Sequence, residues 1–126
     1  MKKLIILMTY AGSLAFTGLP SVALAEETGI AAYYSNVFQG RKTACGDRYD
    51  KDALTAAHNT YPCGTQVRVT NLENNRSVIV TVNDRGPSTP GRIIDLSRRA
   101  ARELGYLKKG LARVKVEVVS SPKKSH

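Results

Sequence analysis

Short segments in which apolar residues alternate with polar ones recur along the chain and are typical of β-strands. The pattern is clearest where Val78, Val80 and Val82 share one face of an extended segment. Near the C-terminus, valines alternate with charged residues in the same way. We therefore predict strands over residues 30–35, 66–71, 78–82, 92–96 and 114–118.

Local signals mark the ends of these strands. Asparagine tolerates positive φ, so the Asn-Asn pair within residues 72–77 is expected to close a hairpin. After the strand at 92–96, Ser97 suits a helix N-cap, a small apolar stripe follows, and Gly105 suits the C-terminal cap. Several short strands with one short helix indicate a closed barrel, which leaves no sheet edge exposed. The expected fold is mainly β, with one or two short helices.

The first residues are typical of an export signal. Lys2 and Lys3 precede an apolar stretch, and Ala23-Leu24-Ala25 has the small-x-small pattern of a cleavage site. We interpret residues 1–25 as a signal peptide. The alternative is a membrane anchor. A helix that spans a membrane needs about 20 consecutive apolar residues, which this stretch does not provide. With no cysteine for lipidation just after the signal, we expect no stable membrane anchor after cleavage.

The rest of the chain is long enough for one small domain, which we place at residues 26–119. We expect it to be a monomer. Residues 120–126 are polar and basic, and we expect this tail to be disordered.

Positive charge dominates the exported part of the chain. Without Lys2 and Lys3, seventeen basic residues face ten acidic ones, a net charge of +7. The partner is therefore expected to be anionic, although a basic surface can also serve solubility alone. The export signal argues against nucleic acid, whereas peptidoglycan, with its carboxylates, fits both charge and compartment.

Cys45 and Cys63 are the two cysteines of the chain. In an exported protein such a pair is interpreted first as a disulfide. The alternatives are a catalytic thiol or a pair of metal ligands, which the lack of clustered histidines makes less favoured. A disulfide would join the segment that contains Asp47 to the turn after His58.

Asp84 is the leading candidate for chemistry. It follows a strand and precedes Arg85-Gly86-Pro87, which turns the chain, so its carboxylate is expected on a rigid base with access to ligand. The alternative is an aspartate that caps its own backbone. His58 titrates near neutral pH in its unperturbed state and could act as an acid or base, or simply pack.

Other polar residues are ranked lower. Asp95, between Ile94 and Leu96, is expected to be a buried structural carboxylate held by hydrogen bonds. Arg92 could pair with an aspartate or with a substrate carboxylate. Arg85 is a further candidate for substrate binding, and Tyr34 could offer a face for sugar stacking or simply pack.

Four segments together closely resemble the rare lipoprotein A family. They are Gly40-Arg41-Lys42-Thr43-Ala44-Cys45-Gly46-Asp47, Leu54-Thr55-Ala56-Ala57-His58, Val82-Asn83-Asp84-Arg85-Gly86-Pro87 and Gly91-Arg92-Ile93-Ile94-Asp95-Leu96-Ser97. The resemblance extends over roughly residues 29 to 119. It implies a six-stranded double-psi β-barrel that cuts peptidoglycan glycan strands in the periplasm, without a cofactor or metal.

The resemblance also implies roles for residues. The aspartate of the Asn-Asp-Arg-Gly-Pro motif, Asp84, is the family's catalytic residue, and the histidine of Thr-Ala-Ala-His, His58, lines the active site. Members commonly carry Glu where this chain has Asp47, so its reach toward the substrate is the least secure of the three.

A lytic transglycosylase uses no water at the cleavage step, because the C6 hydroxyl of the muramic acid attacks C1 and closes a 1,6-anhydro ring. One carboxyl can therefore serve twice. We expect Asp84 to protonate the departing oxygen and then to accept the proton of the attacking hydroxyl.

Two other functions remain open at this point. An expansin-like module would bind polysaccharide without cleaving it. A glycoside hydrolase would need Asp47 as a genuine partner to Asp84.

Overall fold

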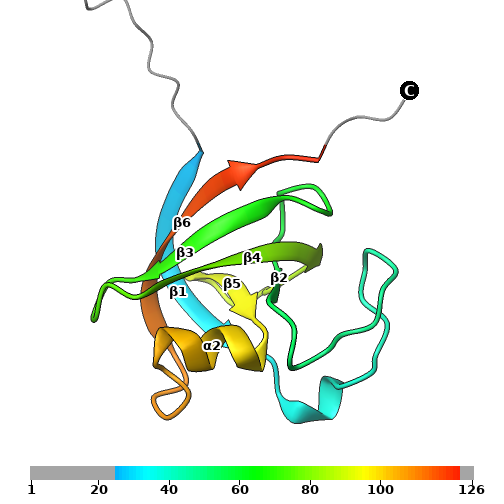
Figure 1. The fold of residues 1–126 in the computed structure, drawn as a ribbon, viewed down its shortest axis with the longest axis horizontal. Helices are drawn as coiled ribbons and strands as arrows, with labels where there is room; N and C mark the ends of the chain where they lie inside the picture. The colour runs from blue at the N-terminus through cyan, green and yellow to red at the C-terminus, as the bar shows by residue number, and fades with distance from the viewer. Residues whose placement is uncertain (1–24, 123–126) are drawn as a thin grey trace, which may run out of the picture.

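The computed structural model describes residues 25–122 of the chain (Figure 1). Residues 1–24 of the expected signal peptide and 123–126 of the expected tail lie outside this range. The described elements, in chain order, are β1 (Glu26–Tyr33), η2 (Asn36–Phe38), β2 (Thr55–Ala57), β3 (Gln66–Asn71), β4 (Ser77–Asp84), β5 (Arg92–Leu96), α2 (Arg98–Leu104) and β6 (Ala112–Ser120).

The six strands close into a barrel in the order β1-β5-β2-β4-β3-β6. Two neighbouring pairs, β1–β5 and β2–β4, are parallel, and the other pairs are antiparallel. This is the double-psi arrangement. The prediction of a small, mainly β barrel of six strands is therefore confirmed. Among the described residues, the helices are α2 and the 3-10 helix η2.

The barrel interior is filled by the alternating residues of its strands. Val67, Val80, Val82 and Val114 are at most 1% exposed, whereas all their neighbours along the strands except the buried Asn83 are half-buried or exposed. Helix α2 lies across one end of the barrel (Figure 1) and buries Ala100, Ala101 and Leu104 against this core.

The predicted helix caps are confirmed. The side chain of Ser97 accepts a hydrogen bond from the Ala100 amide, and Gly105 ends the helix with φ of 81°. This left-handed conformation favours glycine. The hairpin between β3 and β4 also forms as predicted, with Asn75 at φ 62°.

Three strands extend beyond their predicted bounds. β4 runs from Ser77 to Asp84 rather than over residues 78–82. β1 begins at Glu26 rather than at residue 30, and β6 ends at Ser120, where the tail was expected to start. Glu26–Gly29 pair with Glu117–Val114 of β6, so pairing across the barrel supplies the order that the local pattern of residues 26–29 does not indicate.

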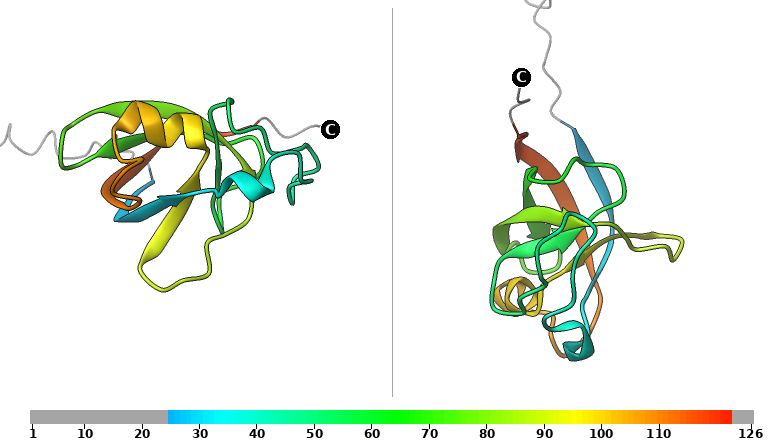
Figure 2. Two further views of the ribbon diagram at one scale, coloured as in Figure 1. Left: turned by 90° about the horizontal axis from the view of Figure 1, so that it is seen from below. Right: turned by 90° about the vertical axis from the view of Figure 1, so that its right-hand side faces the viewer.

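A long segment joins β1 to β2 and extends from the side of the barrel, as Figure 2 shows. It contains η2 and one of the two cysteines. Within residues 25–122, no helix is long and apolar enough to cross a membrane.

Candidate active site

Asp84 is the last residue of β4, so a barrel strand fixes its backbone. The chain leaves the strand directly after it, and Gly86 has φ of 133°, a conformation that residues with a side chain rarely adopt. The strand therefore ends before Arg85-Gly86-Pro87, as predicted, and residues 85–88 have no regular secondary structure. The Asp84 side chain is half-buried and lies at a pocket of about 520 Å³.

Both oxygens of the Asp84 carboxylate accept hydrogen bonds. The hydroxyl of Tyr34 donates to Oδ2 at 2.5 Å, and the amide of Ala44 donates to Oδ1 at 2.8 Å. Burial and the bond to Asp84 raise the pKa of Tyr34, so this hydroxyl keeps its proton and acts as a donor. The carboxylate is thus fixed in orientation from two sides.

Tyr34 lies in a small aromatic group. Its ring stacks on that of Tyr49, with centroids 4.2 Å apart, and meets the edge of Phe38. All three rings line the pocket. The Tyr49 hydroxyl accepts a hydrogen bond from the Arg98 amide, which ties this group to the start of α2.

The predicted disulfide between Cys45 and Cys63 is present. The two segments that it joins both form hydrogen bonds with the end of β4. The amide of Cys45 donates to the carbonyl of Asn83, and the amide of Gly64 donates to that of Val82. The disulfide thereby holds the loop that carries the Ala44 amide against the strand that carries Asp84.

Asp47 closes this same loop. Its carboxylate accepts hydrogen bonds from Asn83 Nδ2 at 2.9 Å and from Thr43 Oγ1 at 2.8 Å. The bond from Asn83, with a further contribution from Thr43, lowers the pKa of Asp47. Asp47 is not among the residues that line the pocket. Its contacts anchor the loop.

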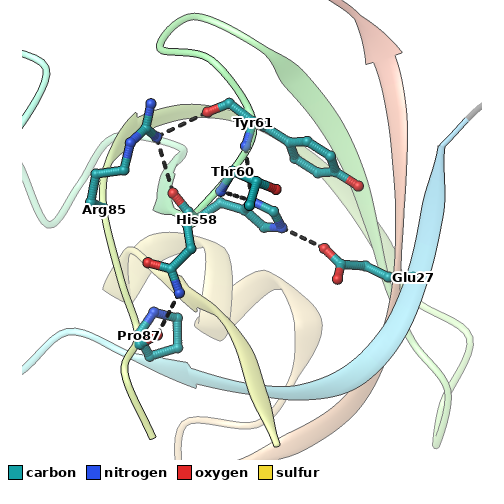
Figure 3. Close-up of polar contacts among 7 residues, drawn as sticks. Glu27, His58, Thr60, Tyr61, Arg85 and Pro87 are labelled. Carbon is teal, nitrogen blue, oxygen red and sulfur yellow. Dashed lines mark hydrogen bonds and ion pairs between the residues drawn. The ribbon is translucent and has the colours of Figure 1, made fainter. Parts of the chain in front are cut away.

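His58 is 4% exposed and is not among the residues that line the pocket, and its imidazole faces Glu27 (Figure 3). It stacks on the ring of Tyr61, with centroids 3.9 Å apart. Nδ1 accepts from the amides of Thr60 and Tyr61, which places the ring proton on Nε2, facing Glu27 of β1. The structure brings the backbone of His58 to Asp84, because the His58 amide donates to the Asp84 carbonyl at 3.0 Å.

Arg85 and Arg92 both line the pocket but differ in their partners. Nη1 of Arg85 donates to the carbonyls of His58, at 3.0 Å, and Tyr61, at 2.9 Å, as Figure 3 shows. Arg92, at the start of β5, has no hydrogen bond or ion pair from its side chain among the described residues.

Asp95 was expected to be a buried structural carboxylate held by hydrogen bonds, and this prediction is wrong. Its side chain is half-buried and lines the pocket together with Asp84. Across residues 25–122, no hydrogen bond to its carboxylate is found. Burial raises the pKa of Asp95, Arg92 lowers it, and Asp84 adds to the rise. Alternation correctly places Asp95 on the face opposite to Ile94 and Leu96, but this face borders a pocket.

No group of three or more His, Cys, Asp or Glu side chains that could hold a metal ion occurs in the described part of the chain. The chemistry available at the pocket is that of two carboxyl groups, the Tyr34 hydroxyl and several cations.

The structure is similar to two solved proteins. The Streptomyces papain inhibitor is 26% identical and superposes with a TM-score of 0.64 over 79% of this chain and 100% of that one. The expansin of Clavibacter michiganensis, in its apo form, is 27% identical with a TM-score of 0.61, over 79% and 53% of the two chains.

Two curated relatives are closer in sequence. The endolytic peptidoglycan transglycosylase RlpA of Neisseria meningitidis serogroup A is 51% identical over 104 residues, which are 82% of this chain and 44% of that protein. The protein of the same name from Pasteurella multocida is 55% identical over 91 residues, 72% of this chain and 31% of that protein. This chain therefore spans less than half the length of these relatives.

The model of the lytic transglycolase family matches residues 26–116, a range that contains strands β1 to β5, the first half of β6 and both Asp84 and Asp95. By this match and by the identity to the curated relatives, the chain belongs to the lytic transglycolase family.

Proposed function

We propose that this chain is a lytic transglycosylase that cleaves the β-1,4 bond between N-acetylmuramic acid and N-acetylglucosamine in peptidoglycan glycan strands and leaves 1,6-anhydro ends. Its family and the names of its relatives support this function. The structural observation that carries the proposal is Asp84, held by Tyr34 and Ala44 at the edge of an open pocket.

The hydrogen bonds of Asp84 suit one half of the reaction. As the glycosidic bond at C1 breaks, the C6 hydroxyl of the muramic acid forms a new bond to C1 and must lose its proton. A carboxylate whose two oxygens both act as acceptors is placed to take that proton. Its negative charge also stabilises the positive charge that develops at the sugar ring.

Cations around the pocket suit an anionic substrate. Arg41, Lys42 and Arg92 all line it, and we propose that Arg92 binds a carboxylate of the muramic acid. The guanidinium of Arg92 has no hydrogen-bond or ion-pair partner in the range 25–122, so it is available for this contact. Tyr34 contributes its ring edge to the pocket while its hydroxyl stays on Asp84.

His58, Asp47 and Arg85 are proposed as positioning residues. Asp47 anchors the loop of Ala44, and Arg85 joins the carbonyls of the loop that contains Cys63. His58 fills the space beneath that loop through its stack with Tyr61. The direct catalytic roles implied by the resemblance stay predictions for His58 and Asp47.

Digestion of purified peptidoglycan, with and without stem peptides, tests the activity. Mass analysis of the soluble products separates three outcomes. Anhydro ends support the lytic transglycosylase, reducing ends indicate a hydrolase, and tight binding without products indicates an expansin-like module.

Asp84→Asn tests the site. We expect a loss of at least about 100-fold in turnover, the usual contribution of a positioned acid or base. Asp52→Asn is the matched control, because Asp52 is an exposed aspartate that does not line the pocket. Full turnover in Asp84→Asn would contradict the assignment.

Export is proposed from residues 1–25, with the periplasm as the working compartment. Cell fractionation of the full chain and of a variant without residues 2–25 tests this. The full chain is expected outside the cytoplasm and the shortened chain inside it. Equal distribution of the two would contradict a signal peptide.

A further inference from the structure

The position of Asp95 indicates a role at the pocket rather than in the core. It lies on β5 between Ile94 and Leu96, which are fully buried in the barrel core. Strand alternation therefore directs Asp95 away from this core, and its side chain enters the pocket that Asp84 borders.

Pairing of the strands places the two aspartates on either side of one small residue. Ala57, the last residue of β2, pairs with Asp84 of β4 on one side and with Asp95 of β5 on the other. Neighbouring strands are about 4.8 Å apart, so the two backbones are separated by roughly 10 Å. Paired carboxyl groups act across a glycosidic bond at about 5 to 9.5 Å, and side chains that lean toward each other reach this range.

The space between them is kept clear by residues without bulk. Ala57 presents only a methyl group to the pocket, and Gly86 none. A Cβ added at Gly86 would lie 3.9 Å from both the Ala57 methyl group and Oδ2 of Asp95. A larger side chain at Ala57 would extend into the pocket that both carboxyl groups border.

The two aspartates differ in what they bind. Asp84 receives two hydrogen-bond donors, one on each oxygen, which fix its carboxylate in orientation. Asp95 has no hydrogen-bond donor among the residues that the structure describes. Burial, together with the charge of Asp84, raises its pKa, against the opposing effect of Arg92. Of the two, Asp95 is the carboxyl better suited to hold a proton.

We propose that Asp95 is a second catalytic residue, the acid that donates its proton to the departing glycosidic oxygen. This inference rests on the proposed lytic transglycosylase function. The bond between C1 and the glycosidic oxygen breaks while that oxygen takes the proton of Asp95. The C6 oxygen bonds to C1, and its proton passes to Asp84. Release of that proton to solvent and uptake of one by Asp95 restore the starting state, so no other reactant is needed.

Asp95→Asn, measured beside the wild type and Asp52→Asn, tests the proposal with three readouts. We expect turnover of glycan strands to fall by at least about 100-fold. Binding to intact sacculi should stay within about twofold of wild type. The Tm at pH 7 should be no lower than that of the wild type, because Asn removes a half-buried carboxyl whose charged form is disfavoured by burial.

The pH profile of the wild type supplies an independent readout. Turnover should fall on the alkaline side as Asp95 loses its proton, and this limb should be absent from the residual activity of Asp95→Asn. Asp95→Glu keeps the carboxyl and should recover part of the turnover.

The outcomes separate the two proposals. If the wild type forms no anhydro products, the proposed function is wrong. Anhydro products from the wild type together with near-normal turnover of Asp95→Asn overturn the role of Asp95 alone. Loss of turnover accompanied by a lower Tm or by lost sacculus binding would make Asp95 a structural residue, and would also overturn it.

Discussion

Of the two donors to Asp84, the Tyr34 hydroxyl can be removed without changing the rest of the site. Tyr34→Phe keeps the ring that stacks on Tyr49 and removes the hydrogen bond to Oδ2 of Asp84. A hydrogen bond to a charged group contributes about 1.5 to 3 kcal/mol, so we expect kcat to fall by roughly 10- to 100-fold. Steady-state turnover of glycan strands checks this. An unchanged kcat would show that Asp84 does not need this donor.

Asp47 gives a prediction for the pH dependence of stability. Its pKa is lowered in the folded protein by Asn83 and Thr43. A depressed carboxyl pKa contributes stability above the unfolded value, near 3.9, and this contribution is lost as the pH falls through the folded value. Asp47→Ala should therefore lower the free energy of unfolding by about 1 kcal/mol at pH 7, discounted for the exposure of the side chain.

Below about pH 4, Asp47→Ala and the wild type should approach equal stability. Urea unfolding at several pH values measures the difference. Asp52→Ala serves as the control, because Asp52 is exposed and its carboxylate contacts only neighbouring Lys51. A penalty for Asp47→Ala that grows toward acid pH would contradict the assigned hydrogen bonds.

Single residues differ in how far the sequence reveals them. Asp84 could be found because its motif combines a strand end, a turn and a polar residue within six positions. Asp95 could not be assigned to the pocket, because alternation gives the face of a strand but not what lies beyond it. The Glu27 partner of His58 is 31 positions away in the chain and has no local signal.

At the scale of elements, the Cys45–Cys63 disulfide joins two loops that flank the end of β4. Cross-linking a loop of this length stabilises a small protein by about 3 kcal/mol through restriction of the unfolded chain. Reduction should lower the free energy of unfolding by about this amount. It should also lower turnover in the part of the population that stays folded, because the Ala44 amide is no longer held against Asp84.

The double variant Cys45→Ser/Cys63→Ser should behave like the reduced protein and should not respond to reductant. Denaturant unfolding and turnover, each with and without reductant, give the four values needed. Reduced protein with the Tm and turnover of the oxidised form would rule out a positioning role for the disulfide.

Elements with local signals were predicted more closely than those without. Helix α2 is bounded by Ser97 and Gly105, whose conformations depend on neighbours a few residues away. Strand β2 has three residues and gains its order from β4 and β5 on either side. Because its order depends on these distant partners, the alternation of residues predicted no strand at this position.

At the scale of the molecule, closure of the barrel brings together residues that lie on separate segments of the chain. β2 lies between β4 and β5, so its last residue brings Asp84 and Asp95 to one pocket although β4 and β5 are not neighbours. The closed order of strands was expected from the resemblance, since hydrophobic periodicity alone does not distinguish one barrel from another. The combination of two carboxyl groups at the pocket required the structure.

The charge of the whole chain leads to a prediction about binding. The chain carries a net charge of +9, and Arg41, Lys42 and Arg92 line the pocket. Attraction between exposed charges is screened over about 10 Å at 0.1 M salt and about 3 Å at 1 M. Binding of Asp84→Asn, which should not degrade its substrate, to purified sacculi should therefore weaken severalfold between about 0.05 and about 0.5 M NaCl.

Arg92→Gln separates the pocket from the rest of the surface in this experiment. If Arg92 binds a substrate carboxylate directly, the variant should bind more weakly at low salt and depend less on salt than its parent. Arg68→Gln removes one charge from an exposed position of β3, outside the pocket. It should reduce both the binding at low salt and the salt dependence by less than Arg92→Gln does. Equal effects of the two variants would assign the attraction to net charge alone, and would leave Arg92 without a specific part in recognition.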